Sequence, residues 1–258
     1  MKPDGESRAV WDAQDALVLK YVALRIAEDL PRHPRCEHLR GHGGVKQSIQ
    51  RLHDAITGGE MQFVCRTDIR GYYRHIRKAE LYGLVRAAVA DPALCAIVKQ
   101  FVYYSVEDGG EFHTPETGIS RGCALSPLLG GSLLYHMDRY FSGISGLYYA
   151  RYMDDIVILS GTRWRLRRAV KALNRFFEAS GFEKHPDKTY TGRISHGFDW
   201  LGMQLDDRGV TGMSARSVEK RRERCRRLYE RARRRGESHE AALARVADYR
   251  KRSWFTIM

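Results

Sequence analysis

The sequence contains no uninterrupted apolar run of about 18 residues, the length that a membrane-spanning helix requires. Its first residues, Met1–Glu6, lack the apolar core of a secretory signal peptide. Cysteine is scarce, with five residues in 258, and no two of them are spaced as Cys-x-x-Cys. This pattern favours reduced thiols over a disulfide framework. We therefore expect a cytoplasmic protein without a membrane partner.

Two kinds of phosphate or metal motif are also missing. No Gly-x-x-x-x-Gly-Lys-Ser/Thr sequence is present, which excludes a phosphate-loop nucleotidase. Cys36, His38 and His42 lie in a glycine-rich loop, but no fourth ligand follows at a spacing suited to zinc. The glycines of this loop favour close approach to another backbone or to a phosphate.

Positive charge is abundant, and the formal net charge is +13. Much of it lies between Arg216 and Arg235, where eleven Lys/Arg and three Asp/Glu leave a net charge of +8. Such a concentration favours a polyanionic partner, of which nucleic acid is the commonest. An ordinary solvated helix face is the alternative that composition leaves open.

A Tyr-Met-Asp-Asp sequence at residues 152–155 stands between two apolar, β-prone runs, residues 147–151 and 156–159. The runs predict a hairpin with its turn at residues 153–155. Adjacent carboxylates repel and cost free energy to bury, and a hard divalent cation such as Mg²⁺ reverses that cost. A solvated turn is the ordinary interpretation of an isolated Asp pair. The apolar flanks, and a further Asp68 ending a predicted strand, favour a metal site instead.

The remaining pattern indicates an α+β fold with an antiparallel sheet at its centre. Apolar periodicity predicts helices over residues 12–30, 46–56, 78–90, 93–103, 127–141 and 163–179. Ser126 is the expected N-cap of the fifth, and Ser214 caps a final basic helix. Strands are expected at residues 61–68, 182–183, 190–194 and 198–204, with a hairpin over residues 105–114. If the strands are neighbours, the three carboxylates meet at one sheet edge, as two-metal phosphoryl transfer requires.

At this point the residues resemble the motifs of reverse transcriptases, in particular the group II intron and group II-like bacterial lineage. Residues 152–155 are similar to the family's catalytic hairpin, and residues 68–73 to its first carboxylate motif. Residues 118–129 resemble the nucleotide-binding loop and helix, 185–189 the motif with a triphosphate lysine, and 198–202 the primer-grip turn. Five motifs in the family's order, within residues 12–205, are far more specific than one.

The resemblance implies a role for each matched residue. Asp68, Asp154 and Asp155 are expected to bind two Mg²⁺ ions, with Mn²⁺ as an alternative and the Ile69 carbonyl as an extra ligand. The nucleotide would contact Ile69, Tyr73, Arg121, Gly122 and Lys188. Tyr73 would exclude a 2′-hydroxyl, and Lys188 would neutralise phosphate or protonate the leaving pyrophosphate.

The primer and the duplex have their own expected contacts. The primer end would be supported by Leu201 and Gly202, and the phosphates of the duplex by Lys220, Arg221, Arg224 and Arg227. The family has proline and glutamine where this chain has Ser120 and Arg121, so nucleotide discrimination is expected to differ.

The implied architecture is a polymerase right-hand palm with an antiparallel sheet, partial helical fingers and the start of a basic helical thumb. We expect fingers over residues 1–59, palm over 60–205 and thumb over 206–258. The family's basic fingers segment would precede residue 1, and its thumb would continue past residue 258. The chain is therefore expected to be truncated at both ends.

The expected activity is that of an RNA-directed DNA polymerase. It would extend the 3′-hydroxyl of a DNA or RNA primer on an RNA template, with deoxynucleoside triphosphates as substrates. The alternative is a catalytically weak palm that binds RNA as the remnant of a mobile element. A nucleotidyl cyclase is disfavoured because its Gly-Gly-Asp/Glu-Glu-Phe centre is absent. Whether an intron, a retron-like system or an antiviral defence operon encodes the chain stays open.

Overall fold

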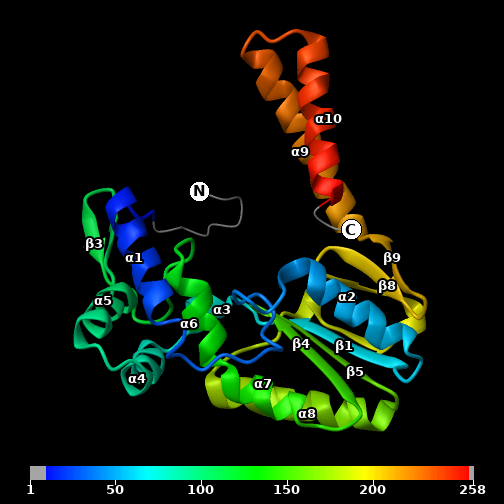
Figure 1. Cartoon of the computed structure of the whole chain (residues 1–258), viewed down its shortest axis with the longest axis horizontal. Coiled ribbons are helices and arrows are strands. Elements are labelled where there is room, and N and C mark those ends of the chain that lie inside the picture. Colours follow the sequence, from blue (N-terminus) through cyan, green and yellow to red (C-terminus); the bar gives the residue numbers. More distant parts are fainter. Residues whose placement is uncertain (1–9, 256–258) are drawn as a thin grey trace.

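The computed structural model describes residues 10–255, and a four-stranded antiparallel sheet lies at its centre (Figure 1). The sheet order is β4-β5-β1-β6. Its strands are β1 (Phe63–Asp68), β4 (Leu147–Tyr152), β5 (Asp155–Ser160) and β6 (Tyr190–Arg193). The expected α+β class with a central antiparallel sheet is confirmed.

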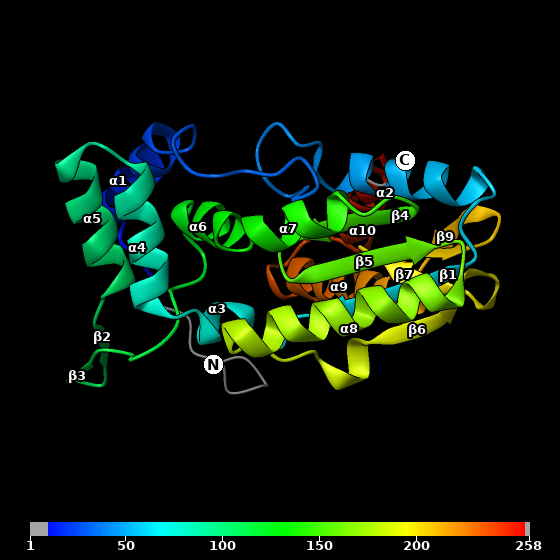
Figure 2. The ribbon, with the colours of Figure 1, turned by 90° about the horizontal axis from the view of Figure 1, so that it is seen from below.

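Both faces of the sheet are largely buried at β1, β4 and β5, whereas the edge strand β6 is partly exposed. Cys65, Ile156 and Ile158 belong to one core, together with residues of α7 (Tyr135–Ser142) and α8 (Arg163–Ser180). Val64, Val157 and Leu159 belong to a second core on the opposite face. That core is completed by α2 (Gly44–Thr57) and Trp200. Figure 2 shows α8 lying lengthwise across the sheet. The strand ends that carry the acidic residues are thus held between two packed layers.

A group of helices lies beyond one end of the sheet (Figure 1). It consists of α1 (Ala13–Arg25), α3 (Tyr72–His75), α4 (Lys78–Ala88), α5 (Pro92–Val102) and α6 (Leu125–Leu133). The strands β2 (Val106–Asp108) and β3 (Glu111–His113) form the expected small hairpin beside them. Buried residues of α1, α4, α5 and α6 share the core of the α8 face, so this group is continuous with the sheet's packing.

The C-terminal part consists of a small sheet and a helical hairpin. The strands β7 (Phe198–Trp200), β8 (Met203–Asp206) and β9 (Gly209–Met213) form the sheet. The helices α9 (Ala215–Arg234) and α10 (His239–Phe255) pack against each other and project from the rest of the molecule (Figure 1). Ser214 is the N-cap of α9, as expected, and its Oγ accepts from Ser217 N.

Several expected boundaries are wrong in the first half of the chain. The helix expected over residues 12–30 ends at Arg25, and Pro31 disfavours helical geometry at the residue before it. Ser126 is not an N-cap, because α6 already begins at Leu125 and the Ser126 hydroxyl donates to Ser120 O at 2.6 Å. The helix expected over residues 127–141 is interrupted at Leu134 and forms α6 and α7.

Other differences lie around the sheets. Asp155 belongs to β5 and not to the turn before it. Residues 182–183 form no strand, and only an isolated bridge joins Ile69 to Lys184. The strand expected over residues 198–204 is divided into β7 and β8. The sequence patterns did not predict α3, β9 or α10.

Three further expectations concern the chain as a whole. All five cysteines are free thiols, so none forms a disulfide. Within residues 10–255 no helix is long and apolar enough to cross a membrane. The expected truncation concerns the chain ends, and residues 1–9 and 256–258 lie outside the described residues.

Candidate active site

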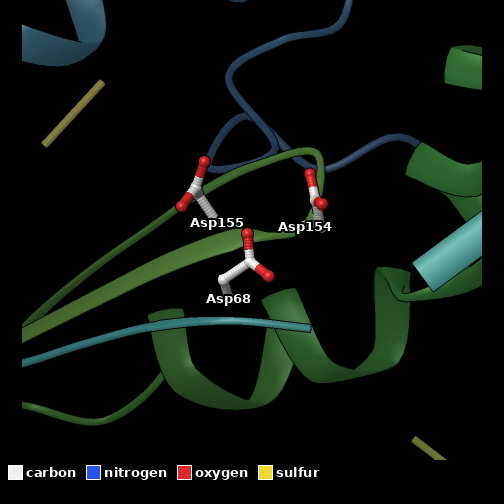
Figure 3. A group of neighbouring side chains, drawn as sticks. All are labelled: Asp68, Asp154 and Asp155. Atoms are coloured by element: carbon white, nitrogen blue, oxygen red, sulfur yellow. The ribbon is translucent and has the colours of Figure 1, made fainter. Parts of the chain in front are cut away.

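Three carboxylates meet where β1 ends and β5 begins. The antiparallel register places Asp68 directly opposite Asp155, and Asp154 lies in the tight turn before β5. Each of the three offers a carboxylate oxygen within 4.8 Å of the others. In Figure 3 the Asp68 carboxylate rises from β1 between the two carboxylates of the hairpin. This spacing allows one cation to contact oxygens from more than one of the three residues.

The electrostatics of the cluster disfavour three free negative charges. Burial, opposed by Arg66 and reinforced by Asp154, raises the pKa of Asp155 to about 6. Burial and the charge of Asp68 also raise the pKa of Asp154. Two cations offset part of this cost: Arg66 Nη2 lies 3.2 Å from Asp155 Oδ1, and Lys188 Nζ lies 2.8 Å from Asp68 Oδ2. A group of oxygen ligands that resists ionisation without added positive charge fits divalent metal ions.

A basic cavity of about 770 Å³ opens beside Asp68 and Asp154. Its cationic lining comes from four separate parts of the chain: Arg70, Arg74, Arg121, Lys188 and Arg216. Arg121 and Lys188 are residues that the sequence motifs predicted. Arg70 and Arg74 were missed, although they lie within and just after the first carboxylate motif. Arg216 was missed because only folding brings the first turn of α9 to this site. The lining suits a polyphosphate close to the carboxylates.

The other predicted nucleotide residues lie around this cavity but do not line it. Tyr73 is buried, with its ring against Gly130, where a Cβ would lie 3.1 Å from Tyr73 Cε1. The Arg121 guanidinium lies 5.8 Å from the centre of the Tyr73 ring. Ile69 is buried behind Asp68, and its N–H donates to Asp154 O at 3.0 Å. Gly122 has a φ of +96° and open space beside its Cα.

The loop that carries Gly122 is fixed against α3. Gly118 N and Ile119 N donate to the carbonyls of Ile76 and Tyr73. A Cβ at Gly118 would lie 2.7 Å from Arg74 O, so the close approach requires glycine there. The loop therefore keeps Arg121 at a fixed position relative to Tyr73.

Gly118–Gly122 also matches Gly-x-Ser-x-Gly, the nucleophile motif of serine hydrolases. Ser120 is buried, and its Oγ accepts from Trp11 Nε1 at 3.1 Å and donates to Arg121 O. The serine does not sit on the sharp strand-to-helix turn that such a nucleophile requires. The match therefore carries no acyl-transfer chemistry.

The predicted primer-grip pair forms the turn between β7 and β8. Leu201 has a φ of +47° and Gly202 a φ of +90°, as in the type I′ turns that suit two-residue hairpins. Gly202 O accepts from Ser214 N at 2.9 Å. A Cβ on Gly202 would lie 2.7 Å from Ser217 Oγ. The turn is thus joined directly to the start of α9.

The four predicted nucleic-acid contacts on α9 do not all face the same way. Lys220, Arg224 and Arg227 line a shallow groove of about 390 Å³. Arg227 also pairs with Glu223, one helical turn earlier. Arg221 points elsewhere and donates to Arg250 O on α10 at 3.3 Å. Arg221 therefore joins the two helices, whereas the other three present charge along the groove.

Comparison with known proteins defines the family. Residues 17–205 match the model of the reverse transcriptase (RNA-dependent DNA polymerase) family, so the chain belongs to that family. Members of this family generally use divalent metal ions. No curated protein sequence matches the chain.

Solved structures of telomerase share the fold. Apo telomerase from Candida Tropicalis is 11% identical with a TM-score of 0.57, covering 80% of this chain and 41% of that chain. Telomerase from Candida albicans in complex with a fragment of telomeric RNA is 13% identical with a TM-score of 0.56. That match covers 83% of this chain and 42% of the other. The present chain thus spans about two fifths of these relatives, and the likeness concerns the fold alone.

Proposed function

We propose that the chain is an RNA-directed DNA polymerase that extends a primer 3′-hydroxyl on an RNA template by two-metal nucleotidyl transfer. The observation that carries the proposal is the meeting of Asp68, Asp154 and Asp155 beside a basic cavity. Family membership supports polymerase chemistry at this place.

In this proposal Asp68, Asp154 and Asp155 hold two Mg²⁺ ions, for which Mn²⁺ could substitute, and the Ile69 carbonyl is an additional ligand. Bound divalent ions would activate the attacking hydroxyl and stabilise the leaving oxygen. Lys188 already neutralises Asp68 and lines the cavity. From this position the Lys188 ammonium could pair with the triphosphate in place of Asp68, or donate a proton to pyrophosphate.

The other cationic side chains of the cavity would orient the incoming deoxynucleoside triphosphate. Arg121 and the missed Arg70, Arg74 and Arg216 place positive charge around the space next to Asp154. Tyr73 would lie under the sugar and exclude a 2′-hydroxyl, with Gly122 leaving room for the base pair. The packing of Tyr73 against Gly130 supports this role, because a ring held from behind cannot withdraw from the added oxygen.

The primer and the template would follow the small sheet and α9. Leu201 and Gly202 would support the primer end, while Lys220, Arg224 and Arg227 contact phosphates along their groove. Arg221, engaged with Arg250, would act by holding α10. Within this scheme residues 1–59 correspond to partial fingers, 60–205 to the palm and 206–258 to the start of the thumb. We further propose a group II intron-like lineage, on the resemblance of the motifs.

The test is primer extension on an RNA template with the parent, Asp154→Asn and Asp207→Asn. Removing the Asp154 charge should lower the rate by roughly 100- to 1,000-fold or more. The metal ions would lose a ligand, and the transition state would lose the stabilisation that those ions supply. Asp207 lies in the exposed turn between β8 and β9, so the same chemical change there should leave the rate unaltered.

Equal incorporation by the parent and Asp154→Asn would refute the catalytic assignment. If the parent binds RNA without extending any primer, with or without Mg²⁺, the chain acts as an RNA-binding palm. That outcome would replace the polymerase proposal with the alternative function.

A further inference from the structure

The residue before the catalytic aspartate has an unfavourable backbone conformation. Met153 has a φ of +57°, a region that costs a residue with a side chain roughly 1–2 kcal/mol. Asp154 follows it directly, so the backbone at Met153 determines where the Asp154 carboxylate points. Such a conformation persists only where surrounding contacts hold it.

Both polar backbone groups of Met153 are held by side chains. Its N–H donates to His38 Nδ1 at 3.0 Å. Its carbonyl accepts from Arg151 Nη1 at 3.0 Å. The carbonyl of Asp154 accepts from Ile69 N at 3.0 Å. Three consecutive peptide units of the turn are therefore each held by one hydrogen bond.

The surroundings of His38 select one tautomer. Its Nε2 lies 3.0 Å from Pro127 O, and a carbonyl can only accept, so Nε2 carries the proton. Its Nδ1 faces the Met153 N–H, which can only donate, so Nδ1 carries a lone pair. Burial lowers the pKa of His38 to about 4, which agrees with a neutral ring.

The segment that carries His38 is built to reach this position. Glu37 N donates to Arg151 O, and Arg151 N donates to Arg35 O, each at 2.8 Å. Residues 35–37 thus add to the outer edge of β4. This contact comes from residues that precede the loop glycines. An added Cβ would meet no atom within 4 Å at Gly41 or Gly44, and at Gly43 only the Gln47 side chain, so the close approach to another backbone expected for these glycines is not observed.

We propose that His38 is a positioning residue that fixes the catalytic turn through the Met153 N–H and joins that turn to the start of α6. The proposal rests on the proposed function. The Pro127 contact connects His38 to α6, the helix that follows the nucleotide-binding loop. This loop and helix form a motif of their own, separate from the two motifs that contain the aspartates. His38 touches no reacting atom and acts by orienting Asp154.

Two substitutions test the contacts of the two ring nitrogens separately. In His38→Asn the amide oxygen reaches the position of Nδ1 and can still accept from Met153 N. In His38→Gln the longer side chain reaches the position of Nε2 and keeps only the Pro127 contact. His42→Gln is the matched control, because His42 lies in the same loop and its Nδ1 contacts Cys36 O.

The measurements are kcat and KM for the deoxynucleoside triphosphate, Mn²⁺ affinity by electron paramagnetic resonance, and Tm. His38→Gln should lower kcat by about tenfold and weaken Mn²⁺ binding several-fold, because one turn N–H loses its acceptor. KM should stay within about twofold, since the nucleotide contacts remain. His38→Asn should stay within about threefold of the parent in kcat, KM and Mn²⁺ affinity, as expected when the acceptor is retained.

Two results would overturn the proposal. One is parental kcat and Mn²⁺ affinity in His38→Gln. The other is an equal loss in both His38 variants that follows Tm, which would assign a merely structural role. If the parent extends no primer, the proposed function fails, and the comparison of Mn²⁺ affinities still decides about His38.

Discussion

The turn between β4 and β5 and the turn between β7 and β8 have the same length, and each contains a residue with an unfavourable backbone conformation. Each connects two paired strands through two residues, Met153–Asp154 in the first and Leu201–Gly202 in the second. Among the described residues, Met153 and Leu201 are the two non-glycine residues with positive φ. Both turns lie at positions where the family motifs place function.

The two turns differ in what holds them. The second has glycine at its next position, and its carbonyl is bound by Ser214, twelve residues further along the chain. The first has an aspartate there, and it depends on His38 and on the buried Arg151. A turn that contains glycine therefore needs little support beyond one backbone hydrogen bond from the segment that follows it. Where a carboxylate must occupy the turn, contacts from distant segments replace glycine.

The largest expected effect concerns Arg151, whose guanidinium is fully buried against Asp138, with Nη2 also donating to Gly131 O at 2.8 Å. Arg151→Met should lower the free energy of unfolding by about 3–5 kcal/mol, because it leaves the Asp138 carboxylate buried and unpaired. Urea denaturation measures this.

The double variant Arg151→Met with Asp138→Leu should recover part of the loss, since no unpaired charge then remains. A change below about 1 kcal/mol in Arg151→Met, the usual range for exposed ion pairs, would show that the first turn does not depend on the interior.

An intermediate effect is expected from pH. The pKa of His38 is lowered from 6.5 to about 4 in the folded chain. Stability from the neutral ring is therefore complete above pH 6.5 and is lost as pH falls towards 4. The unfolding free energy of the parent should fall by about 3 kcal/mol relative to that of His38→Asn over this interval, because only the parent carries the ring that must be protonated.

Denaturant titrations at several pH values between 7 and 4, roughly the interval in which the unfolded and folded His38 titrate, provide the measurement. Ionisable groups that do not interact with His38 cancel in the difference. A difference that does not vary with pH would mean that the ring is solvated and that the first turn is held without it.

The smallest effect is expected at Gly202. Gly202→Ala should lower the free energy of unfolding by about 1 kcal/mol, because alanine disfavours positive φ. The new Cβ would also lie 2.7 Å from Ser217 Oγ. Thermal unfolding of Gly202→Ala, alone and combined with Ser217→Ala, separates the two causes.

If Ser217→Ala restores full stability to Gly202→Ala, close approach to α9 is what demands glycine, and backbone conformation contributes nothing. Persistence of the loss in the double variant would support the type I′ geometry as the cause. The second turn would then be explained by its local conformation.

Patterns within single segments predicted much of the fold. Alternation and turn residues located β1, β4 and β5 to within two residues, and Ser214 correctly marked the start of α9. The predictions failed where two tendencies compete. Residues 198–204 are β-prone throughout, yet Leu201 and Gly202 adopt left-handed conformations and divide the strand. Ser126 has cap chemistry, but its hydroxyl is taken by the Ser120 carbonyl.

The sequence by itself determined that an acidic residue ends one strand, that an Asp pair lies at a hairpin and that a long basic helix follows, because strand propensity, turn chemistry and capping act over a few neighbouring residues. Only the tertiary structure decided that Asp68 faces Asp155, that Arg216 enters the cavity and that His38 reaches Met153. Asp68 and Asp155 are 87 residues apart in the sequence, and Asp68 and Arg216 are 148 residues apart. Contacts at such separations depend on how the layers pack around the sheet, which no local pattern specifies.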